Sequence, residues 1–119
     1  MELTRETIDN VCVCRISGRL DAEAADTFRT MLHQVSALAG GPVVFSLEGV
    51  QFIGSACLGA LVSCRAKLGK DRAIALFGLG APVRQVFASA KLDQVFQIAS
   101  TEADAMMLVK GGDRPGTMA

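Results

Sequence analysis

The amino-acid sequence predicts a single α/β domain built around a mixed, mostly parallel β-sheet. Half of the 119 residues are apolar, which is enough for one buried core and too many for a disordered chain. Short apolar segments alternate with longer ones in which apolar residues recur at the spacing of a helix. Strands that alternate with helices require parallel pairing, so the expected order is β-β-α-β-α-β-α-β-α, with an antiparallel hairpin at the start.

The N-terminal hairpin is expected to pair strands at 3–8 and 11–17 around a tight turn at Asp9-Asn10. Residues 18–21 are expected to form a loop, with Asp21 capping the helix that follows. An amphipathic stripe of apolar residues at helical spacing indicates that helix. The stripe consists of Phe28, Met31, Leu32, Val35 and Leu38.

The middle of the chain carries the most informative feature, a serine between a strand and a helix. Gly40-Gly41-Pro42 ends the first helix, and an apolar strand at 43–47 is expected to lead into a turn at 48–51. Ser55 then stands directly before the apolar helical run 56–68. Its hydroxyl could cap that helix, and a phosphate here would meet free N–H groups and the positive end of the helix dipole.

The C-terminal half continues the alternation of strand and helix. A strand is expected at 73–77, then a short helix with Pro82 in its first turn, and then a strand at 94–98. A final helix is expected to begin after Ser100 or Thr101, either of which suits an N-cap.

Composition excludes several classes of function. The formal net charge is zero, which argues against a nucleic-acid-binding domain, and no apolar run has the roughly 20 residues of a membrane span. Because the N-terminus does not resemble a signal peptide, the expected location is the cytoplasm. The four cysteines show no Cys-x-x-Cys spacing and are expected to be buried apolar residues, so neither a metal nor a cofactor is expected.

Catalytic motifs are also missing from the sequence. The chain has one histidine, His33, and no tyrosine, so general bases are scarce. Gly54-Ser55-Ala56 lacks the Gly-x-Ser-x-Gly spacing of a nucleophile elbow. Gly78 and Gly80 lie between a strand and a helix, but Val83 replaces the third glycine of a dinucleotide fingerprint, so both glycines are expected in turns. We therefore expect a protein without enzymatic activity.

Two interpretations of the segment around Ser55 follow from the residues alone. In the first, Gly54 makes a turn, Gly59 packs against a strand, and Ser55 is only a helix cap. In the second, the two glycines leave room for the backbone of a partner, and Ser55 lies in a docking surface. Both interpretations stay open at this point.

Three segments resemble the STAS family, the sulfate-transporter and anti-sigma-factor-antagonist domain. Residues 18–22, Gly-Arg-Leu-Asp-Ala, are similar to its early Gly-x-Leu-Asp loop, and residues 43–59 to its diagnostic strand–turn–helix segment. Residues 77–96 resemble its C-terminal half. The resemblance covers nearly the whole chain and implies a domain over residues 1–110 with helices packed mainly on one face of the sheet. The end of the sequence, rich in glycine, is expected to form a flexible tail at 111–119.

The resemblance to bacterial anti-sigma factor antagonists implies a partner-switching regulator. The usual helix-start pattern is Asp-Ser-(Ser/Thr)-Gly-Leu-Gly, and Ser55 matches the residue that a partner kinase phosphorylates. This chain has Gly54 in place of the aspartate, Cys57 in place of the first glycine, and Ser46 in place of a strand acid. The resemblance implies that the unmodified protein binds a serine kinase or anti-sigma factor, that phosphorylation releases it, and that a phosphatase acts on Ser55. The partner-binding residues that it implies are Arg19, Asp21, Ser46, Gly54, Ser55, Ala56, Leu58 and Gly59.

Two other functions are compatible with the same residues. A stand-alone STAS domain can be a subunit of an ABC-type membrane transport complex, in which the same helix face would hold an ATPase subunit. A nucleotide or another small ligand could instead bind at the ends of the parallel strands, near Gly54 and Gly78.

Overall fold

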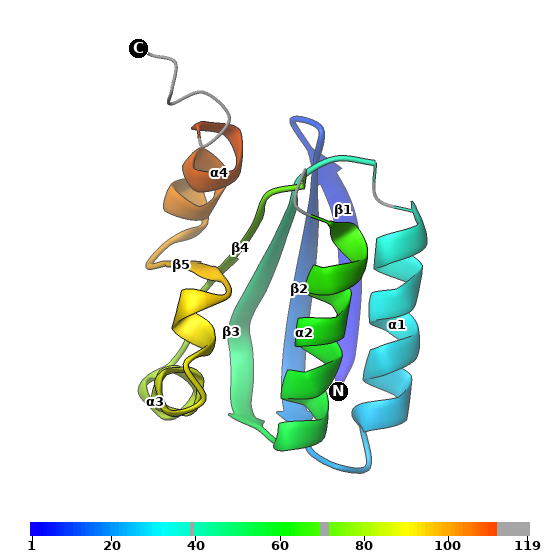
Figure 1. The fold of residues 1–119 in the computed structure, drawn as a ribbon, viewed down its shortest axis with the longest axis vertical. Coiled ribbons are helices and arrows are strands. Elements are labelled where there is room, and N and C mark those ends of the chain that lie inside the picture. Colours follow the sequence, from blue (N-terminus) through cyan, green and yellow to red (C-terminus); the bar gives the residue numbers. More distant parts are fainter. Residues whose placement is uncertain (39, 70–71, 112–119) are drawn as a thin grey trace.

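The computed structural model describes residues 1–38, 40–69 and 72–111. In this part of the chain, helices flank a five-stranded sheet in the expected order of elements (Figure 1). The tail expected at 111–119 lies, apart from Gly111, outside the described residues. The elements are β1 (Glu2–Ile8), β2 (Val11–Leu20), α1 (Ala25–Leu38), β3 (Val43–Ile53), α2 (Ser55–Leu68), β4 (Ile74–Phe77), α3 (Ala81–Ser89), the 3₁₀ turn η1 (Leu92–Gln94), β5 (Gln97–Ala99) and α4 (Glu102–Gly111).

The strands lie side by side in the order β1-β2-β3-β4-β5. β1 and β2 pair antiparallel, whereas the pairs from β2 to β5 are all parallel. The mixed, mostly parallel sheet that the sequence predicts is thus confirmed. Because the carboxyl ends of parallel strands share one edge of a sheet, that edge is where residues of β2, β3 and β4 can form a common site.

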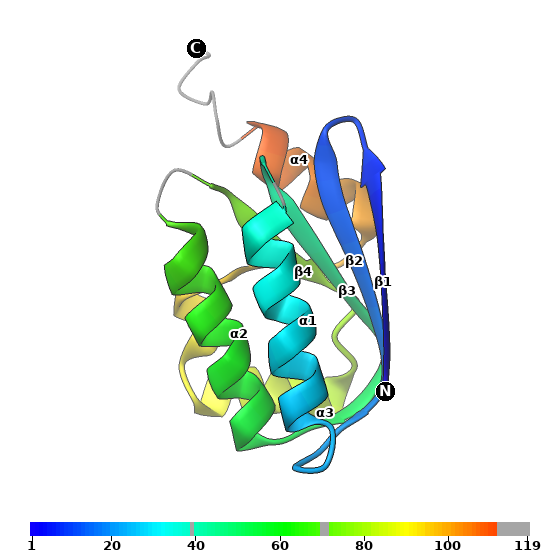
Figure 2. The ribbon, with the colours of Figure 1, turned by 90° about the vertical axis from the view of Figure 1, so that its right-hand side faces the viewer.

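The helices cover the two faces of the sheet unequally. α1, α2 and α3 pack on one face, where Phe28, Leu61 and Phe87 belong to the larger apolar cluster. α4 packs on the opposite face, where Ala105 and Val109 join a smaller cluster (Figure 2). Among the described residues, three of the four α-helices therefore lie on one face, as the family resemblance implies.

The hairpin turn predicted at Asp9-Asn10 is confirmed. Both residues have positive φ, 52° and 67°, which is the combination that a type I′ turn requires. This turn type matches the twist of the two strands that it connects and sets their register, in which Leu3 lies opposite Ile16 and Ile8 opposite Val11.

The turn predicted at 48–51 is wrong. β3 runs without interruption through this segment, and it pairs with β2 to its end across two register shifts. Gly49 makes this possible, because a Cβ atom there would lie 2.6 Å from the Cβ of Ser17 on β2. The glycine marks a close approach of two strands rather than a turn.

Two other elements differ from their predicted bounds. β2 extends to Leu20, so most of the loop predicted at 18–21 is strand. The last strand is β5 at Gln97–Ala99 rather than 94–98, because η1 takes up the residues before it.

The apolar stripe of α1 is confirmed except at its end. Phe28, Leu32 and Val35 are buried, and Met31 is half-buried. Leu38 lies in the last turn and is 67% exposed.

Candidate functional site

The carboxyl ends of β2 and β3 meet the start of α2 at one edge of the sheet. The N–H of Gly54 donates to the carbonyl oxygen of Leu20 at 2.8 Å and so joins the two strand ends. The carbonyl oxygen of Gly54 accepts the N–H of Leu58 at 3.0 Å, which opens the helix. These bonds place Ser55 at the same edge as Arg19, the residue before the end of β2.

Ser55 is the first residue of α2 and not its cap. Gly54 occupies the N-cap position, with φ −97° and ψ 172°, and no side chain caps the helix. The interpretation of Ser55 as a helix cap is therefore wrong, because the helix begins one residue earlier than the cap position would require. The Ser55 side chain is exposed and has no structural task at the helix terminus.

The first turn of α2 has a positive end that no acid of the helix itself compensates. That turn contains no acidic residue, and the N-cap supplies no oxygen to the first N–H groups. A Cβ atom on Gly54 would lie 3.6 Å from the Leu20 oxygen, an ordinary contact, so the fold would accept a capping side chain here. The glycine instead leaves these N–H groups available to an anion at Ser55.

Arg19 and Phe52 lie beside the start of α2, at the same edge of the sheet. The guanidinium carbon of Arg19 lies 4.6 Å from the centre of the Phe52 ring, which is a cation–π contact between neighbouring strand ends. Arg19 Nε also lies 3.8 Å from Asp21 Oδ2. Because Phe52 remains 41% exposed, the edge presents a cation, a carboxylate and an aromatic ring together.

Asp21 connects this edge to both neighbouring helices. Its Oδ1 accepts the N–H of Ala24 at 3.1 Å just before α1, which confirms its predicted capping role. Its carbonyl oxygen accepts the thiol of Cys57, in the first turn of α2, at 3.7 Å. Burial, together with the nearby charge of Asp21, raises the pKa of Cys57, so this thiol stays protonated at neutral pH.

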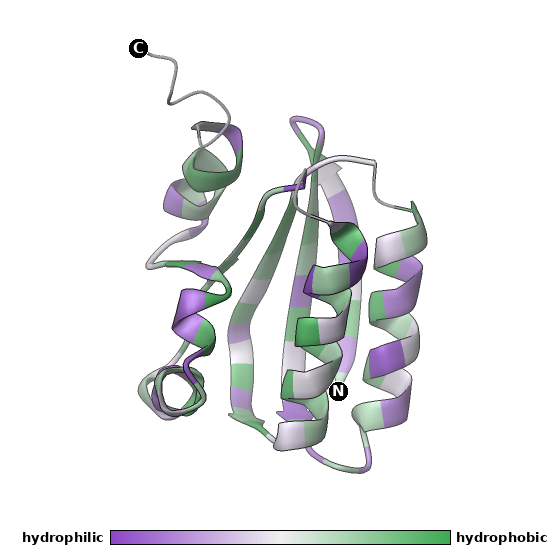
Figure 3. Cartoon of the chain, viewed as in Figure 1, coloured by the Kyte–Doolittle hydropathy of each residue, from purple (hydrophilic) through white to green (hydrophobic). Residues whose placement is uncertain are grey.

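The exposed face of α2 is uncharged over its first half. Ala56, Gly59 and Ser63 are exposed, and Val62 is 37% exposed. Figure 3 shows neutral and apolar colours along this part of α2, with strongly hydrophilic residues only near its C-terminal end. A Cβ atom on Gly59 would meet nothing within 4 Å, so the interpretation that this glycine packs against a strand is wrong.

Two of the residues predicted to bind a partner lie beneath this surface instead of on it. Ser46 is 4% exposed, in the interior of β3 opposite Phe77, and a partner cannot reach it in this fold. Leu58 is half-buried and packs against the main core. The structure brings the other predicted residues together at the edge: Arg19, Asp21, Gly54, Ser55, Ala56 and Gly59.

Sequence reasoning did not single out Phe52 and Val62. Val62 lies seven positions after Ser55, two helical turns, so the helical period could have placed it on the same face. Phe52 carried no such signal, since an aromatic residue at the end of an apolar strand is usually buried.

Other kinds of site are not found in the described residues. No group of three or more His, Cys, Asp or Glu side chains is arranged there to hold a metal ion, and the four cysteines are free thiols. His33 is exposed on α1, where its Nδ1 lies 3.1 Å from Lys67 Nζ. Within the same residues, none of the helices has both the length and the hydrophobicity to cross a bilayer.

The chain is a single-domain α/β protein with a mixed sheet, in which a helix that begins with a serine follows the central strand β3. The profile of the STAS domain matches residues 2–105. The chain belongs to the STAS domain family, as the three resembling segments predict.

The chain is similar to anti-sigma factor antagonists. It is 29% identical over 104 residues to the anti-sigma-F factor antagonist RsfB of Mycobacterium tuberculosis, a match that covers 87% of this chain and 85% of RsfB. The crystal structure of an anti-sigma factor antagonist from Mycobacterium paratuberculosis superposes with a TM-score of 0.86 at 28% identity, over 92% of this chain and 93% of that one. The antagonist SpoIIAA in its unphosphorylated form shares the fold, with a TM-score of 0.75 at 24% identity over 92% and 97% of the two chains.

Proposed function

We propose that this protein is a non-enzymatic, cytoplasmic antagonist that binds a kinase-type anti-sigma factor through the surface around Ser55. The relationship to RsfB and to the M. paratuberculosis protein supports the class of partner. The observation that carries the proposal is the Ser55 side chain, which is exposed and does not cap α2. A hydroxyl without a structural task, at the centre of an exposed surface, suits a docking and modification site.

The surface has the properties of a small protein interface. Its exposed helix face is uncharged, so a partner would not have to desolvate ions there. Phe52 offers an exposed aromatic ring, a residue type that is enriched at protein interfaces. The open space above Gly59 admits close approach of a partner backbone.

Phosphorylation of Ser55 would act on this interface by electrostatics. The phosphate adds about 1.5 to 2 negative charges, and burying them against an uncharged partner surface is costly. A penalty of about 3 kcal/mol would weaken binding roughly a hundredfold. The positive end of α2 would stabilise the same phosphate in the free protein, so the fold should survive modification. The fold neighbour SpoIIAA has been solved in both an unphosphorylated and a phosphorylated form.

Ser55 is the single hydroxyl residue in the first turn of α2. The family pattern has a second hydroxyl residue at the next position, where this chain has Ala56. A kinase that reads this helix start therefore has one acceptor within the turn. A phosphatase that removes the phosphate would restore the docking surface.

The proposal is tested with the candidate anti-sigma factor from the same organism. Incubation with this partner and Mg-ATP should place one phosphate on Ser55, located by mass spectrometry, and Ser55→Ala should take up none. In calorimetric titrations, authentic phosphoprotein should bind the partner about a hundredfold more weakly than unmodified protein.

Ser55→Glu provides a genetically encoded approximation of the phosphorylated state. It should weaken binding in the same direction, whereas Gln34→Glu, which adds one charge to an exposed position of α1, should leave affinity unchanged. Equal affinities for the phosphorylated and unmodified proteins would contradict the switch. Recovery of a transporter ATPase subunit in place of an anti-sigma factor would replace the proposed function with that of a transport subunit.

A further inference from the structure

A cavity of about 880 Å³ opens between the N-terminal hairpin and the end of α1. It lies at the hairpin-turn end of β2, whereas Ser55 follows the opposite ends of the strands. Its volume is within the usual range of small-molecule sites. Nothing in the docking proposal uses this cavity. Its walls are formed by Leu3, Arg5, Glu6, Thr7, Asn10, Cys12, Leu38, Gly40, Gly41 and Pro42.

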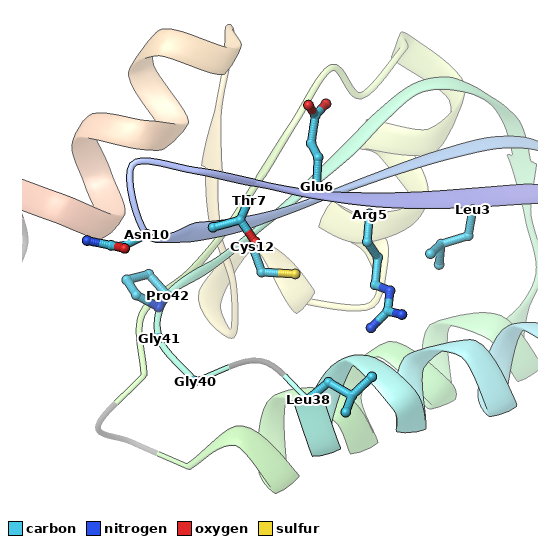
Figure 4. A pocket seen from close by; sticks show the side chains of 10 residues that line it. All are labelled: Leu3, Arg5, Glu6, Thr7, Asn10, Cys12, Leu38, Gly40, Gly41 and Pro42. Atoms are coloured by element: carbon cyan, nitrogen blue, oxygen red, sulfur yellow. The ribbon is translucent and has the colours of Figure 1, made fainter.

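Arg5 supplies the charge that faces this cavity. Its position on β1 lies opposite Cys14 of β2, a fully buried residue on the helix-covered face of the sheet. Figure 4 shows the guanidinium extending from β1 toward the end of α1. No carboxylate of the described residues lies within ion-pair distance of it. Arg5 is exposed and has no acid of the described residues to pair with, so its guanidinium can bind an external anion.

The acidic residue in the cavity wall does not neutralise Arg5. Glu6 projects to the other side of β1 (Figure 4), because successive residues of a strand alternate between faces. Its Oε2 accepts a hydrogen bond from Arg15 Nε at 2.8 Å. The wall that the structure describes therefore presents one cation and no available carboxylate to a ligand.

The rest of the wall combines apolar groups with the polar residues Thr7 and Asn10. Leu38, which the helical stripe predicts to be buried, is 67% exposed here, and Leu3 and Cys12 are partly buried against the core. The apolar ring of Pro42 adds to the same wall. A ligand chain lying over these groups would cover the large exposed area of Leu38.

We propose that this cavity binds a small amphipathic anion, a carboxylate or phosphate head group on a short apolar chain. The head group would pair with the Arg5 guanidinium, whose forked donors match both kinds of oxyanion. The chain would lie along Leu3, Leu38 and Pro42. A nucleoside triphosphate does not fit this site, since a single arginine cannot balance its charge.

The test uses octyl compounds that differ only in the head group. Octanoate and octyl phosphate, each below its micelle concentration, are titrated into the protein and followed by ¹⁵N amide shifts, with octanol as the neutral control. We expect saturable shifts at Arg5, Thr7 and Gly41 with at least one of the two anions and weaker binding of octanol. Which anion binds more tightly identifies the head group.

Substitutions and a chemical probe locate the site independently. Arg5→Gln should weaken binding of the anion about tenfold or more, while Arg84→Gln, at an exposed position of α3, should not change it. Cys12 is half-buried and the other three cysteines are buried, so bound anion should slow alkylation of Cys12 by iodoacetamide. Absence of saturable shifts with both anions would overturn the proposal. It would also be overturned by equal binding of octanol or unchanged affinity in Arg5→Gln.

Discussion

At the scale of single residues, Ser55 and Thr101 show two different roles for a hydroxyl at a helix start. Thr101 Oγ1 accepts the N–H of Asp104 at 3.1 Å, so this threonine is the N-cap of α4. Ser55 makes no such bond, because α2 begins at Ser55 itself. From the sequence, a cap is one of two interpretations of Ser55, and either Ser100 or Thr101 is expected to cap the last helix. The structure shows a cap at Thr101 and none at Ser55.

This difference predicts opposite outcomes for two alanine substitutions. Ser55→Ala should change the free energy of unfolding by no more than about 0.5 kcal/mol, as for a surface residue without contacts. Thr101→Ala should cost about 1 kcal/mol, the usual loss of a helix cap. Urea unfolding of the two variants and the wild type measures both values. A loss in Ser55→Ala as large as that in Thr101→Ala would show that Ser55 has a structural role after all.

The limits of sequence reasoning at this scale have a physical origin. Asp21, Thr101 and the Asp9-Asn10 turn were predictable because their roles depend on local hydrogen bonds and local φ angles. The position of Ser55 relative to the helix start depends on where β3 ends, and that depends on pairing with β2. If β3 ended one residue later, Ser55 would be the N-cap of α2; as it is, Ser55 is an exposed residue in the first turn.

At the scale of elements, the glycines of β3 and α2 lie in opposite environments. Gly49 lies against β2, where a Cβ atom would be 2.6 Å from the Cβ of Ser17. Gly59 lies on the exposed face of α2, with open space around its Cβ position. The sequence predicts a turn at the first and strand packing as one interpretation of the second, and both assignments differ from the structure. Glycine signals a special backbone environment without saying whether it is a turn, a close strand or an open surface.

Alanine at these two glycines should therefore change stability in opposite directions. Gly49→Ala should destabilise the protein by about 1–3 kcal/mol, because the strands must separate to admit the methyl group. Gly59→Ala should stabilise it by about 0.5–1 kcal/mol through its effect on helix propensity. Thermal and urea unfolding measure both changes. Loss of stability in Gly59→Ala would contradict the open environment of Gly59, because it would mean that the added methyl group meets a neighbouring atom.

Gly59→Ala also separates stability from docking. The added methyl group lies on the surface proposed to bind the anti-sigma factor, where it would hold the partner backbone further away. We therefore expect this variant to be more stable than the wild type and to bind the partner more weakly. Unchanged partner affinity would place the docking surface elsewhere on the molecule.

At the scale of the whole molecule, ion pairs fasten α4 to the N-terminal hairpin. Arg15 Nη1 and Nη2 donate to the two carboxylate oxygens of Glu102 at 2.9 and 3.2 Å, and Lys110 Nζ lies 3.3 Å from Asp9 Oδ2 at the other end of the helix. Between these pairs, the fully buried side chains of α4 are the small Ala105 and Val109. The general fold was predictable from alternating strands and helices, but these pairs between distant segments were not, since no local pattern relates residue 15 to residue 102.

The ion pair between Arg15 and Glu102 should make the free energy of unfolding depend on pH in the acid range. The hydrogen bond from Arg15 lowers the pKa of Glu102 below its ordinary value of 4.5. A carboxylate whose pKa is lower in the folded state stabilises the fold above the unfolded pKa, and this contribution disappears as pH falls through the folded pKa. Both side chains are more than a third exposed, so solvent limits the contribution to at most about 1 kcal/mol. Wild type should therefore be more stable than Glu102→Gln at pH 7, and the two should converge below about pH 4.

Glu2→Gln, which removes the same charge from an exposed position of β1, is the matched control and should show no such convergence. A difference between wild type and Glu102→Gln that stays constant from pH 7 to pH 3 would mean that packing, and not the charged pair, holds α4 against the hairpin.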